Sequence, residues 1–338
     1  MGVDIGELVI KERKTLGAFK NKVIAIDAYN ALYQFLSIIR QPDGTPLKDS
    51  HGRVTSHLSG LFYRTSNLVE HGIKPVYVFD GVPSKLKFQT IEGRADLREK
   101  AALEWKEALE RGDLETARIK AMQSSKLTKE LVEDSKLLLK ALGIPYINAP
   151  SEGEAQASYM AGKKDVYCTA SQDFDSLLFG APKLIRNLTI TGRRKLPRKN
   201  IYIEIEPEEI DSAKTLESLE LTREQLVDIG ILVGTDFNLG IKGIGAKKAL
   251  KLIKEHSNLE NVLRVLGERI EHYDLIRAIF LNPEVTDNYK LIWREADHKA
   301  VKELLCKEHN FSIERVEKAL QKFNIQEKRT QKIVEDWF

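Results

Sequence analysis

The segments "KVIAID" (Lys22–Asp27) and "PVYVFD" (Pro75–Asp80) are short, nearly continuous apolar runs, and each ends in an aspartate. Such runs are typical of strands that are buried on both faces of a parallel sheet. Two helical patterns, "AYNALYQFLSIIR" and "SHLSGLFYRTSNLVEHG", separate them. A strand, a helical crossover and a second strand favour parallel pairing. The two segments therefore predict an α/β fold, with an aspartate at the carboxyl end of each strand.

The rest of the chain extends this pattern. "KELVEDSKLLLKALG" predicts an amphipathic helix closed by Gly143, and "DVYCTA" predicts a further buried strand. We expect "KLIRNL" and "IYIEI" to form a hairpin across "TGRRKLPRKN", and the chain from Pro207 onward to be almost wholly helical. Residues 84–142 interrupt the alternation with a charged, helix-rich stretch. The sequence thus predicts a central, mainly parallel twisted sheet flanked by helices, with a helical insertion.

Composition limits the possible functions. The 338 residues contain 53 Lys+Arg against 50 Asp+Glu, a net charge of only +3, so any nucleic-acid surface must come from an uneven distribution of charge. Cys168 and Cys306 form no CxxC pair and no disulfide framework, which favours a reducing interior. No run approaches the length of a membrane span, and no signal-peptide pattern is present. We expect a soluble intracellular protein that makes no membrane contact.

Acidic side chains gather where the predicted strands end. Two pairs stand out in "PSEGEAQASY" and "SQDFDSLLFG", and a further acid lies in the glycine-bounded turn "LVGTDF". With the two strand-end aspartates, the acids are Asp27, Asp80, Glu152, Glu154, Asp173, Asp175 and Asp236. Ligands of open α/β sheets bind at the carboxyl edge of the strands, so in one sheet these side chains converge. The simpler alternative, a capping box formed by Ser151 and Glu154, explains one glutamate but not the whole set.

Seven carboxylates in one cleft repel one another and require a cation. Hard oxygen ligands without a His or Cys cluster favour Mg²⁺ or Mn²⁺ over zinc. Two such ions would cancel four of the seven charges and form a two-metal phosphodiesterase site. A phosphatase with an aspartyl nucleophile is the other reading of an acidic strand end. That class needs a D-x-D motif, which Asp27-Ala28-Tyr29 lacks.

A glycine-rich turn precedes the helical pattern "AKKALKLIKEH". Glycines leave backbone N–H groups free to meet a phosphate at a helix N-terminus. The turn and the lysines beside it are Gly240, Gly243, Gly245, Lys247, Lys248 and Lys251. This arrangement resembles a helix-hairpin-helix element that binds a DNA backbone without reading sequence. An ordinary helix–helix turn remains the alternative.

Two basic residues of the insertion, Lys87 and Arg94, are seven positions apart and so share one helical face. From that face they could reach across the acidic site to a scissile phosphate. A solvated helical insertion is the alternative.

Taken together, these blocks resemble the flap endonuclease family, the structure-specific 5′ nucleases of DNA replication and repair. The similarity covers nearly the whole chain and includes "MGVDIGELV", "VIAIDAYNALYQFL", "RVTSHLSGLFYRT", "PVYVFDG", "APSEGEAQASYM", "SQDFDSLLFG", "GTDF" and "GIKGIGAKKAL" in order. It implies an N-terminal nuclease region (1–100), a helical arch (84–130) and an internal nuclease region (116–258) that contains the glycine-turn element (236–256). A C-terminal helical region (259–330) and a clamp-binding tail (331–338) follow.

The resemblance also implies residue roles. The seven acids would hold two Mg²⁺ ions, directly or through water, with Mn²⁺ able to substitute. The enzyme would be a Mg²⁺-dependent endodeoxyribonuclease, with an associated 5′–3′ exonuclease activity, that leaves 5′-phosphates. Lys87 and Arg94 match the basic pair that stabilises the transition state. Tyr33 matches the aromatic residue that stacks on a base near the cut, Thr55 lies where the family binds a one-nucleotide 3′ flap, and Gly2 begins a mature N-terminus near the site.

The implied partners are branched DNA with a 5′ flap and a sliding clamp (PCNA). The clamp would bind the tail "QKIVEDWF" through Gln331, Val334, Trp337 and Phe338, which follow the spacing Q-x-x-aliphatic-x-x-aromatic-aromatic. The resemblance implies a monomer of the archaeal type, cytoplasmic and associated with the nucleoid; a eukaryotic member would be nuclear. A K⁺ site at the glycine turn would rely on backbone carbonyls, because Gly240 stands where many members have serine.

Three rival functions remain open. The chain could be a non-catalytic DNA- or clamp-binding scaffold, although no acid of the set is missing. It could be a ribonuclease with a related acidic site, although that class lacks the arch and the glycine-turn element. Within the family, it could be a 5′ exonuclease or a bubble-cutting nuclease, although the compact length and uninterrupted arch favour flap cutting.

Overall fold

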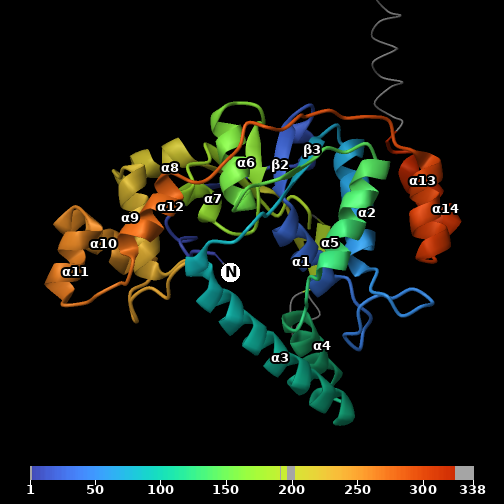
Figure 1. The fold of residues 1–338 in the computed structure, drawn as a ribbon, viewed down its shortest axis with the longest axis horizontal. Helices are drawn as coiled ribbons and strands as arrows, with labels where there is room; N and C mark the ends of the chain where they lie inside the picture. The colour runs from blue at the N-terminus through green and yellow to red at the C-terminus, as the bar shows by residue number, and fades with distance from the viewer. Residues whose placement is uncertain (1, 191, 196–201, 324–338) are drawn as a thin grey trace, which may run out of the picture.

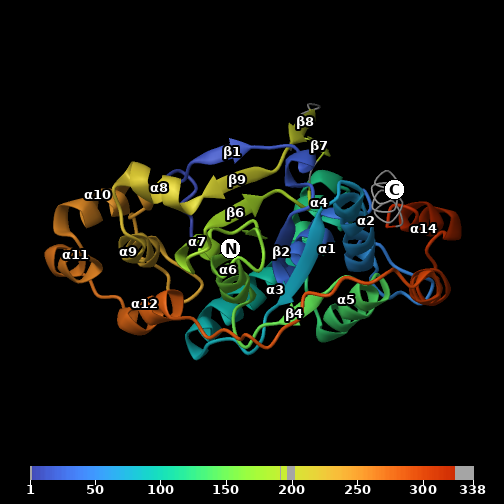
Figure 2. The same ribbon diagram turned by 90° about the horizontal axis from the view of Figure 1, so that it is seen from above.

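The computed structural model describes residues 2–190, 192–195 and 202–323, and its centre is a seven-stranded sheet flanked by helices (Figures 1 and 2). The strands are β1 (Lys11–Arg13), β2 (Val23–Asp27), β3 (Lys74–Phe79), β4 (Tyr146–Asn148), β5 (Cys168–Ala170), β6 (Lys183–Arg186), β7 (Gly192–Lys195), β8 (Tyr202–Ile205) and β9 (Glu208–Asp211). The sheet order is β1-β9-β6-β5-β2-β3-β4. The five strands from β6 to β4 are parallel, and β9 pairs antiparallel with both β6 and β1. The predicted mainly parallel α/β sheet is confirmed.

Helices cover both faces of this sheet. The first part of the chain contributes α1 (Ala28–Ile38), α2 (Ser56–Glu70), α3 (Phe88–Glu110), α4 (Leu114–Gln123), α5 (Lys129–Ala141), α6 (Gly153–Gly162) and α7 (Asp175–Leu178). The remainder contributes α8 (Ser212–Leu219), α9 (Arg223–Val233), α10 (Ala246–His256), α11 (Leu259–Leu266), α12 (Tyr273–Leu281), α13 (His298–Lys302) and α14 (Ile313–Leu320). None of the helices in the described ranges is long and apolar enough to cross a membrane.

Side-chain alternation along the central strands explains the two layers. Ile24 and Ile26 of β2 point into a core formed with α1, α2 and α5, whereas Ala25 between them packs in a second core with α6. Tyr77 and Val78 of β3 divide between the same two cores. Because both faces are apolar, the strands read as continuous apolar runs. This double burial makes β2 and β3 recognisable in the sequence.

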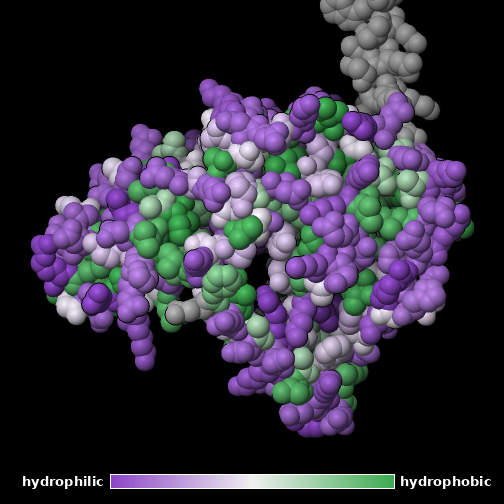
Figure 3. Space-filling view, in the orientation of Figure 1, coloured by the Kyte–Doolittle hydropathy of each residue, from purple (hydrophilic) through white to green (hydrophobic). Residues whose placement is uncertain are grey.

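The helices α3 and α4 form a hairpin, the arch hairpin, that projects from the body of the molecule (Figure 1). It touches the body where the Trp105 indole N–H donates to the carbonyl of Asp43 over 3.2 Å. An ion pair between Lys120 and Glu104 joins the two helices. In the space-filling view the surface is hollowed where the hairpin meets the body (Figure 3). The first part of the charged insertion predicted at 84–142 is therefore this hairpin, whereas α5 packs into the core. The base of the hairpin lies beside the carboxyl edge of the sheet.

The helices α7 and α9 to α12 build a separate apolar core at the other end of the molecule, with Phe179, Phe237 and Phe280 in ring contact. The chain between α12 and α13 then runs without helix back across the sheet, as an orange-red strap in Figures 1 and 2. The Trp293 indole N–H donates to the carbonyl of Pro75 along this path. The strap thus joins the two ends of the fold.

The expected hairpin between "KLIRNL" and "IYIEI" is wrong. The strand from the first segment, β6, lies inside the main sheet between β5 and β9, and β8 pairs with β7 in a separate two-stranded ribbon. Leu184 and Ile185 of β6 are fully buried, which suits a strand covered on both faces. Proximity in the sequence favoured the hairpin, but burial placed β6 in the parallel sheet.

The expectation of an almost wholly helical chain after Pro207 is also wrong in two places. The strand β9 follows directly, and the strap between α12 and α13 is not helical. β9 has the sequence Glu-Glu-Ile-Asp, and its buried Glu209 forms ion pairs with Lys14 at 2.9 Å and Lys183 at 3.3 Å. A strand held by a buried acid has no apolar signature, so periodicity could not reveal it.

One buried histidine predicts a pH dependence of stability. His57 of α2 is fully buried, and within the described part of the chain neither of its ring nitrogens forms a hydrogen bond. Burial, together with the nearby charge of His309, lowers the pKa of His57 to about 3. The nearest acid, Asp134, lies 3.9 Å from its Nε2 atom. The folded protein therefore disfavours the protonated imidazole.

Since the His57 pKa is lowered on folding, the unfolded chain gains this proton first as the pH falls. The associated stability is complete above pH about 6.5 and is lost progressively down to about 3. Between pH 7 and pH 4 we expect wild type to lose about 3 kcal/mol more unfolding free energy than His57→Leu, measured by chemical denaturation. The exposed His71 provides the control, since His71→Gln should follow wild type. Parallel losses in wild type and His57→Leu would contradict this assignment.

Candidate nuclease site

Each of the seven predicted acids is placed by a strand end, a helix start or a turn beside one. Asp27 ends β2 and caps α1, accepting the N–H of Asn30 at 3.0 Å, and Asp80 directly follows β3. Glu152 is the N-cap of α6, and Glu154 lies in its first turn. Acids at these positions are favoured by the exposed N–H groups and the dipole of the helix. Strand ends and a helix start thus place these four acids at the carboxyl edge of the sheet.

The second acidic pair follows the strand β5. Asp173 lies in the turn after β5, and Asp175 is the first residue of the short helix α7. The chain has thus already turned into a helix at Asp175. Asp236 lies in the turn between α9 and α10, as the glycines indicated.

The structure brings all seven acids into one electrostatic network. Burial, and then repulsion from Asp80 and Asp173, raises the pKa of Asp27 well above its usual range. Burial and the neighbouring Glu152 raise the pKa of Asp80 to about 6. In each case the folded protein makes ionisation costly, and neighbouring acids add to that cost.

The same causes act on two further acids, Glu154 and Asp175. Burial and the charge of Asp175 raise the pKa of Glu154 well above its usual range. Burial and the charge of Asp236 raise the pKa of Asp175 to about 7. Clustered carboxyl groups with raised pKa values are characteristic of functional sites.

Two cations from the base of the arch hairpin partly offset this charge. The Lys87 ammonium lies 2.5 Å from Glu152 and 3.4 Å from Asp236. The Arg94 guanidinium binds both carboxylate oxygens of Asp236, one of them at 3.2 Å. Burial disfavours the charge of Lys87, but Glu152, Asp80 and Asp236 outweigh it and raise its pKa. Lys87 reaches the acidic edge from the 3-10 turn just before α3 and Arg94 reaches it from α3 itself, whereas their catalytic role remains a prediction.

The N-terminal segment closes another side of the site. The N–H of Val3 donates to Oδ1 of Asp175 over 2.6 Å. A side chain at Gly2 would begin 2.6 Å from the Asp175 carboxyl group, so only glycine fits there. Gly2 thus lies against Asp175, and its contact with DNA remains a prediction.

The seven acids have the chemistry that binds divalent cations, but their side chains are not arranged as a metal site in the described residues. Among the residues that the structure describes, no three His, Cys, Asp or Glu side chains stand together ready to hold a metal ion. Glu152 and Asp236 instead face Lys87 and Arg94. All seven donors are nonetheless carboxylates, and their mutual repulsion is the condition that a hard divalent cation relieves.

Two other predicted DNA contacts belong to α1 and to the start of α2. Tyr33 is on α1, and the Arg98 guanidinium of the arch hairpin stands 5.0 Å from the centre of its ring. Thr55 is buried directly before α2. Their proposed contacts with a base and with a 3′ flap remain predictions.

The glycine turn forms as expected before α10. Gly245 is the N-cap of this helix, and Gly240 and Gly243 have left-handed φ values of 68° and 81°. A side chain at Gly240 would also collide with the backbone of Val233, so the turn requires glycine twice over. The three predicted DNA-binding lysines, Lys247, Lys248 and Lys251, are exposed on α10. The tail residues Gln331, Val334, Trp337 and Phe338 lie outside the described residues.

Sequence reasoning missed the uncharged side chains that hold the acids. The Asn30 amide donates to Oδ2 of Asp173 at 3.1 Å, and the Ser176 hydroxyl donates to Oε1 of Glu154 at 3.1 Å. Each is a polar residue within an apolar helical pattern, three residues after Asp27 and one after Asp175 respectively. That position beside an acid was the only available signal.

Known proteins resemble this chain over its whole length. Residues 1–101 match the XPG N-terminal domain family, and residues 143–236 match the XPG I-region family. Flap endonuclease 1 of Methanococcoides burtonii is 53% identical over 338 residues and covers 100% of both chains. Flap endonuclease 1 of Pyrococcus furiosus is 54% identical over 340 aligned positions, covering 100% of this chain and 99% of its own.

Solved structures agree with these matches. Flap endonuclease-1 from Methanococcus jannaschii superimposes with a TM-score of 0.76 at 44% identity, covering 95% of this chain and 98% of its own. The catalytic core of Rad2 in complex with DNA substrate, 24% identical with a TM-score of 0.68 and covering 94% of this chain and 97% of its own, supports the fold alone. With the acidic edge, the arch hairpin and the glycine turn all present, the chain belongs to the flap endonuclease family of structure-specific nucleases.

Proposed function

We propose that this protein cleaves branched DNA with a 5′ flap near the junction of single strand and duplex, using Mg²⁺ and leaving a 5′-phosphate. The observation that carries the proposal is the convergence of seven carboxylates with Lys87 and Arg94 at one sheet edge. The acidic site lies beside the base of the arch hairpin, and this position supports a substrate with a free single strand (Figure 1). The flap endonuclease names of the relatives support the same substrate class.

The seven acids would hold two Mg²⁺ ions, and Mn²⁺ ions would be accepted in their place. Bound divalent ions supply Lewis acidity and charge neutralisation for phosphodiester hydrolysis. Lys87 and Arg94 each already pair with an acid, and in the proposal they turn their charges toward the scissile phosphate. Asp27, Asp80, Glu154 and Asp175, whose pKa values are raised, would be held ionised by the cations.

The experiment is a comparison of 5′-labelled flap, duplex and bubble substrates on a sequencing gel, with Mg²⁺ and with EDTA. We expect Mg²⁺-dependent cleavage of the flap near its junction and weaker release of single nucleotides from duplex ends. Preference for the bubble would indicate a bubble-cutting nuclease, and preference for duplex ends would indicate a 5′ exonuclease. Equal DNA binding without any cleavage would favour the scaffold alternative.

The glycine turn and α10 would hold the duplex backbone away from the cut, and the turn would bind K⁺ through its carbonyl oxygens. Double substitution of Lys247 and Lys248 by alanine should weaken duplex binding and reduce the log–log salt slope by about 0.9 for each phosphate that the variant no longer neutralises. Binding measured between about 50 and 200 mM salt gives this slope. Lys254→Ala is the control, because Lys254 lies in the last turn of α10, at the end of the helix away from the glycine turn. An unchanged slope in the double variant would remove these lysines from the DNA surface.

The tail would bind a sliding clamp through Gln331, Val334, Trp337 and Phe338, and the protein would act as a monomer. The support is the spacing of these residues, which places an aliphatic side chain and two aromatics on one side of a helical turn. Deletion of residues 331–338 should abolish stimulation by the clamp and leave clamp-free cleavage of short flaps unchanged. Loss of the clamp-free reaction, or stimulation that survives the deletion, would refute this role.

A further inference from the structure

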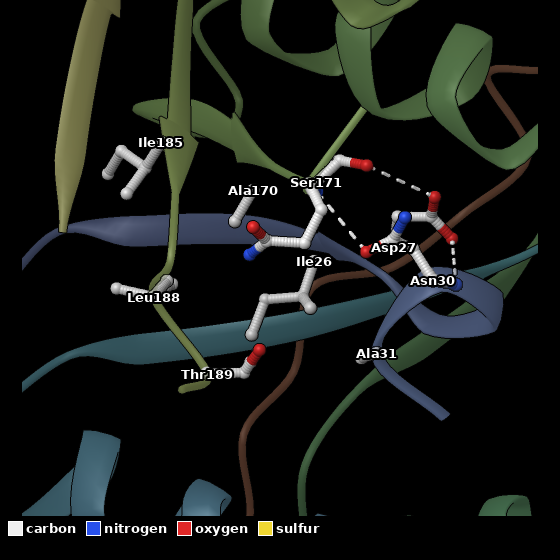
Figure 4. Close-up of a pocket in the computed structure, with 10 residues that line it drawn as sticks. Ile26, Asp27, Asn30, Ala31, Ala170, Ser171, Ile185, Leu188 and Thr189 are labelled. Carbon is white, nitrogen blue, oxygen red and sulfur yellow. Dashed lines mark hydrogen bonds between the residues drawn. The ribbon is translucent and has the colours of Figure 1, made fainter. Parts of the chain in front are cut away.

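Asn30, in the first turn of α1, lies between the two segments that carry Asp27 and Asp173. Its backbone N–H donates to Oδ1 of Asp27 at 3.0 Å, and its side-chain amide donates to Oδ2 of Asp173 at 3.1 Å. Its side-chain carbonyl accepts the backbone N–H of Gln172 at 3.2 Å. Figure 4 shows Asn30 beside Asp27, among the residues that line a small pocket. One uncharged residue thus links the end of β2 with the turn after β5.

The chemistry of the partners fixes which way this amide points. A carboxylate oxygen only accepts, so the NH₂ group must face Asp173, and a backbone N–H only donates, so the carbonyl must face Gln172. Aspartate at position 30 could satisfy Gln172 but not Asp173, because an ionised carboxylate has no donor. The two contacts can therefore be separated by substitution.

Asp173 needs such a restraint because it stands among like charges. Its charge adds to the repulsion felt by Asp27, Glu154 and Asp175. Lys87 and Arg94 reach Glu152 and Asp236 on the other side of the site. The backbone N–H of Asp173 donates to the Ser171 hydroxyl at 3.2 Å, and this bond orients the backbone of Asp173. Asn30 restrains the carboxylate itself without adding charge.

We propose that Asn30 is a positioning residue that holds the Asp173 carboxylate in place for divalent-ion binding. The proposal rests on the function proposed above, and it assigns Asn30 no contact with substrate. Neutral partners that orient ligating carboxylates typically change metal affinity or activity by about 10- to 100-fold when removed.

The test uses the full chain with three substitutions. Asn30→Ala removes both side-chain contacts, and Asn30→Asp keeps the acceptor for Gln172 but removes the donor to Asp173. Thr189→Val is the matched control, since the Thr189 hydroxyl donates to Gln34 of α1 at 2.8 Å on the same pocket without touching an acid. The first readout is the Mg²⁺ midpoint, the concentration that half-saturates the folded protein, obtained without DNA by fitting the rise of the melting temperature with Mg²⁺. The second is the single-turnover rate of flap cleavage.

For Asn30→Ala we expect the Mg²⁺ midpoint to rise at least about tenfold and cleavage to slow by about 10- to 100-fold. Asn30→Asp should cleave no faster than Asn30→Ala, and Thr189→Val should match wild type in both readouts. An unchanged Mg²⁺ midpoint in Asn30→Ala would overturn the proposal. So would recovery of cleavage in Asn30→Asp, because Asn30 would then serve only to anchor Gln172. Failure of wild type itself to respond to Mg²⁺ would instead refute the proposed function.

Discussion

Asp175→Asn is expected to slow flap cleavage at least about 1,000-fold, equivalent to about 4 kcal/mol of transition-state stabilisation. Asparagine keeps the size of the side chain and an oxygen to accept the Val3 N–H, but it removes the charge that a divalent ion needs. Burial and Asp236 already raise the pKa of Asp175 to about 7, so the charge is costly in the metal-free protein. Because the Asp175 charge destabilises the metal-free protein but is needed for metal binding, its removal should reduce the cleavage rate strongly without reducing stability.

Stability measured by denaturation without metal at pH 8 separates these effects. Because the Asp175 pKa is raised on folding, its ionisation costs stability as the pH rises through about 7, and Asp175→Asn removes that cost. We therefore expect Asp175→Asn to be at least as stable as wild type. Asp175→Ala should also be inactive, but about 1–3 kcal/mol less stable than Asp175→Asn, since it leaves the Val3 N–H without its acceptor. Near-normal turnover of Asp175→Asn in Mg²⁺ would refute its assignment as a ligand.

Arg94→Ala should slow single-turnover cleavage by about 100-fold, because a cation directed at the scissile phosphate acts most strongly as charge develops. Flap binding should weaken by much less, about threefold, because Arg94 interacts more weakly with the phosphate in the ground state than in the transition state. The bidentate contact of Arg94 with Asp236 shows that its side chain reaches the acidic edge from the arch hairpin. Pre-steady-state cleavage and equilibrium flap binding together measure the two effects.

Arg94→Lys is the matched control, because it keeps the charge and removes the planar fork. We expect Arg94→Lys to recover part of the rate and nearly all of the binding. Equal losses of rate and affinity in Arg94→Ala would make Arg94 a phosphate anchor without a role in the chemical step.

The acidic edge was predictable because simple rules place its members. Asp27 and Asp80 follow continuous apolar strands, and parallel strands end at one edge of a sheet. Glu152 and Glu154 begin a helix, where acids are favoured. The glycine turn was recognisable because left-handed φ values at Gly240 and Gly243 require a residue without a side chain.

The missed features depend on contacts between distant segments. β9 is held by ion pairs between Glu209 and two lysines, one of them in a different part of the chain, and periodicity does not register such pairs. The pairing of β6 with β5 reflects burial on two faces and not the nearest turn. Asn30 looks like an ordinary polar residue until Asp173, 143 positions away, lies beside it.

The central claim is that the seven carboxylates at the sheet edge hold two divalent ions. Anomalous diffraction from crystals of the protein soaked in Mn²⁺ tests it directly, because the signal locates the ions without relying on activity. We expect two Mn²⁺ peaks among Asp27, Asp80, Glu152, Glu154, Asp173, Asp175 and Asp236, and their disappearance in Asp175→Asn crystals. Mn²⁺ bound only elsewhere on the protein, or an edge that stays free of Mn²⁺ at concentrations that support cleavage, would contradict the claim.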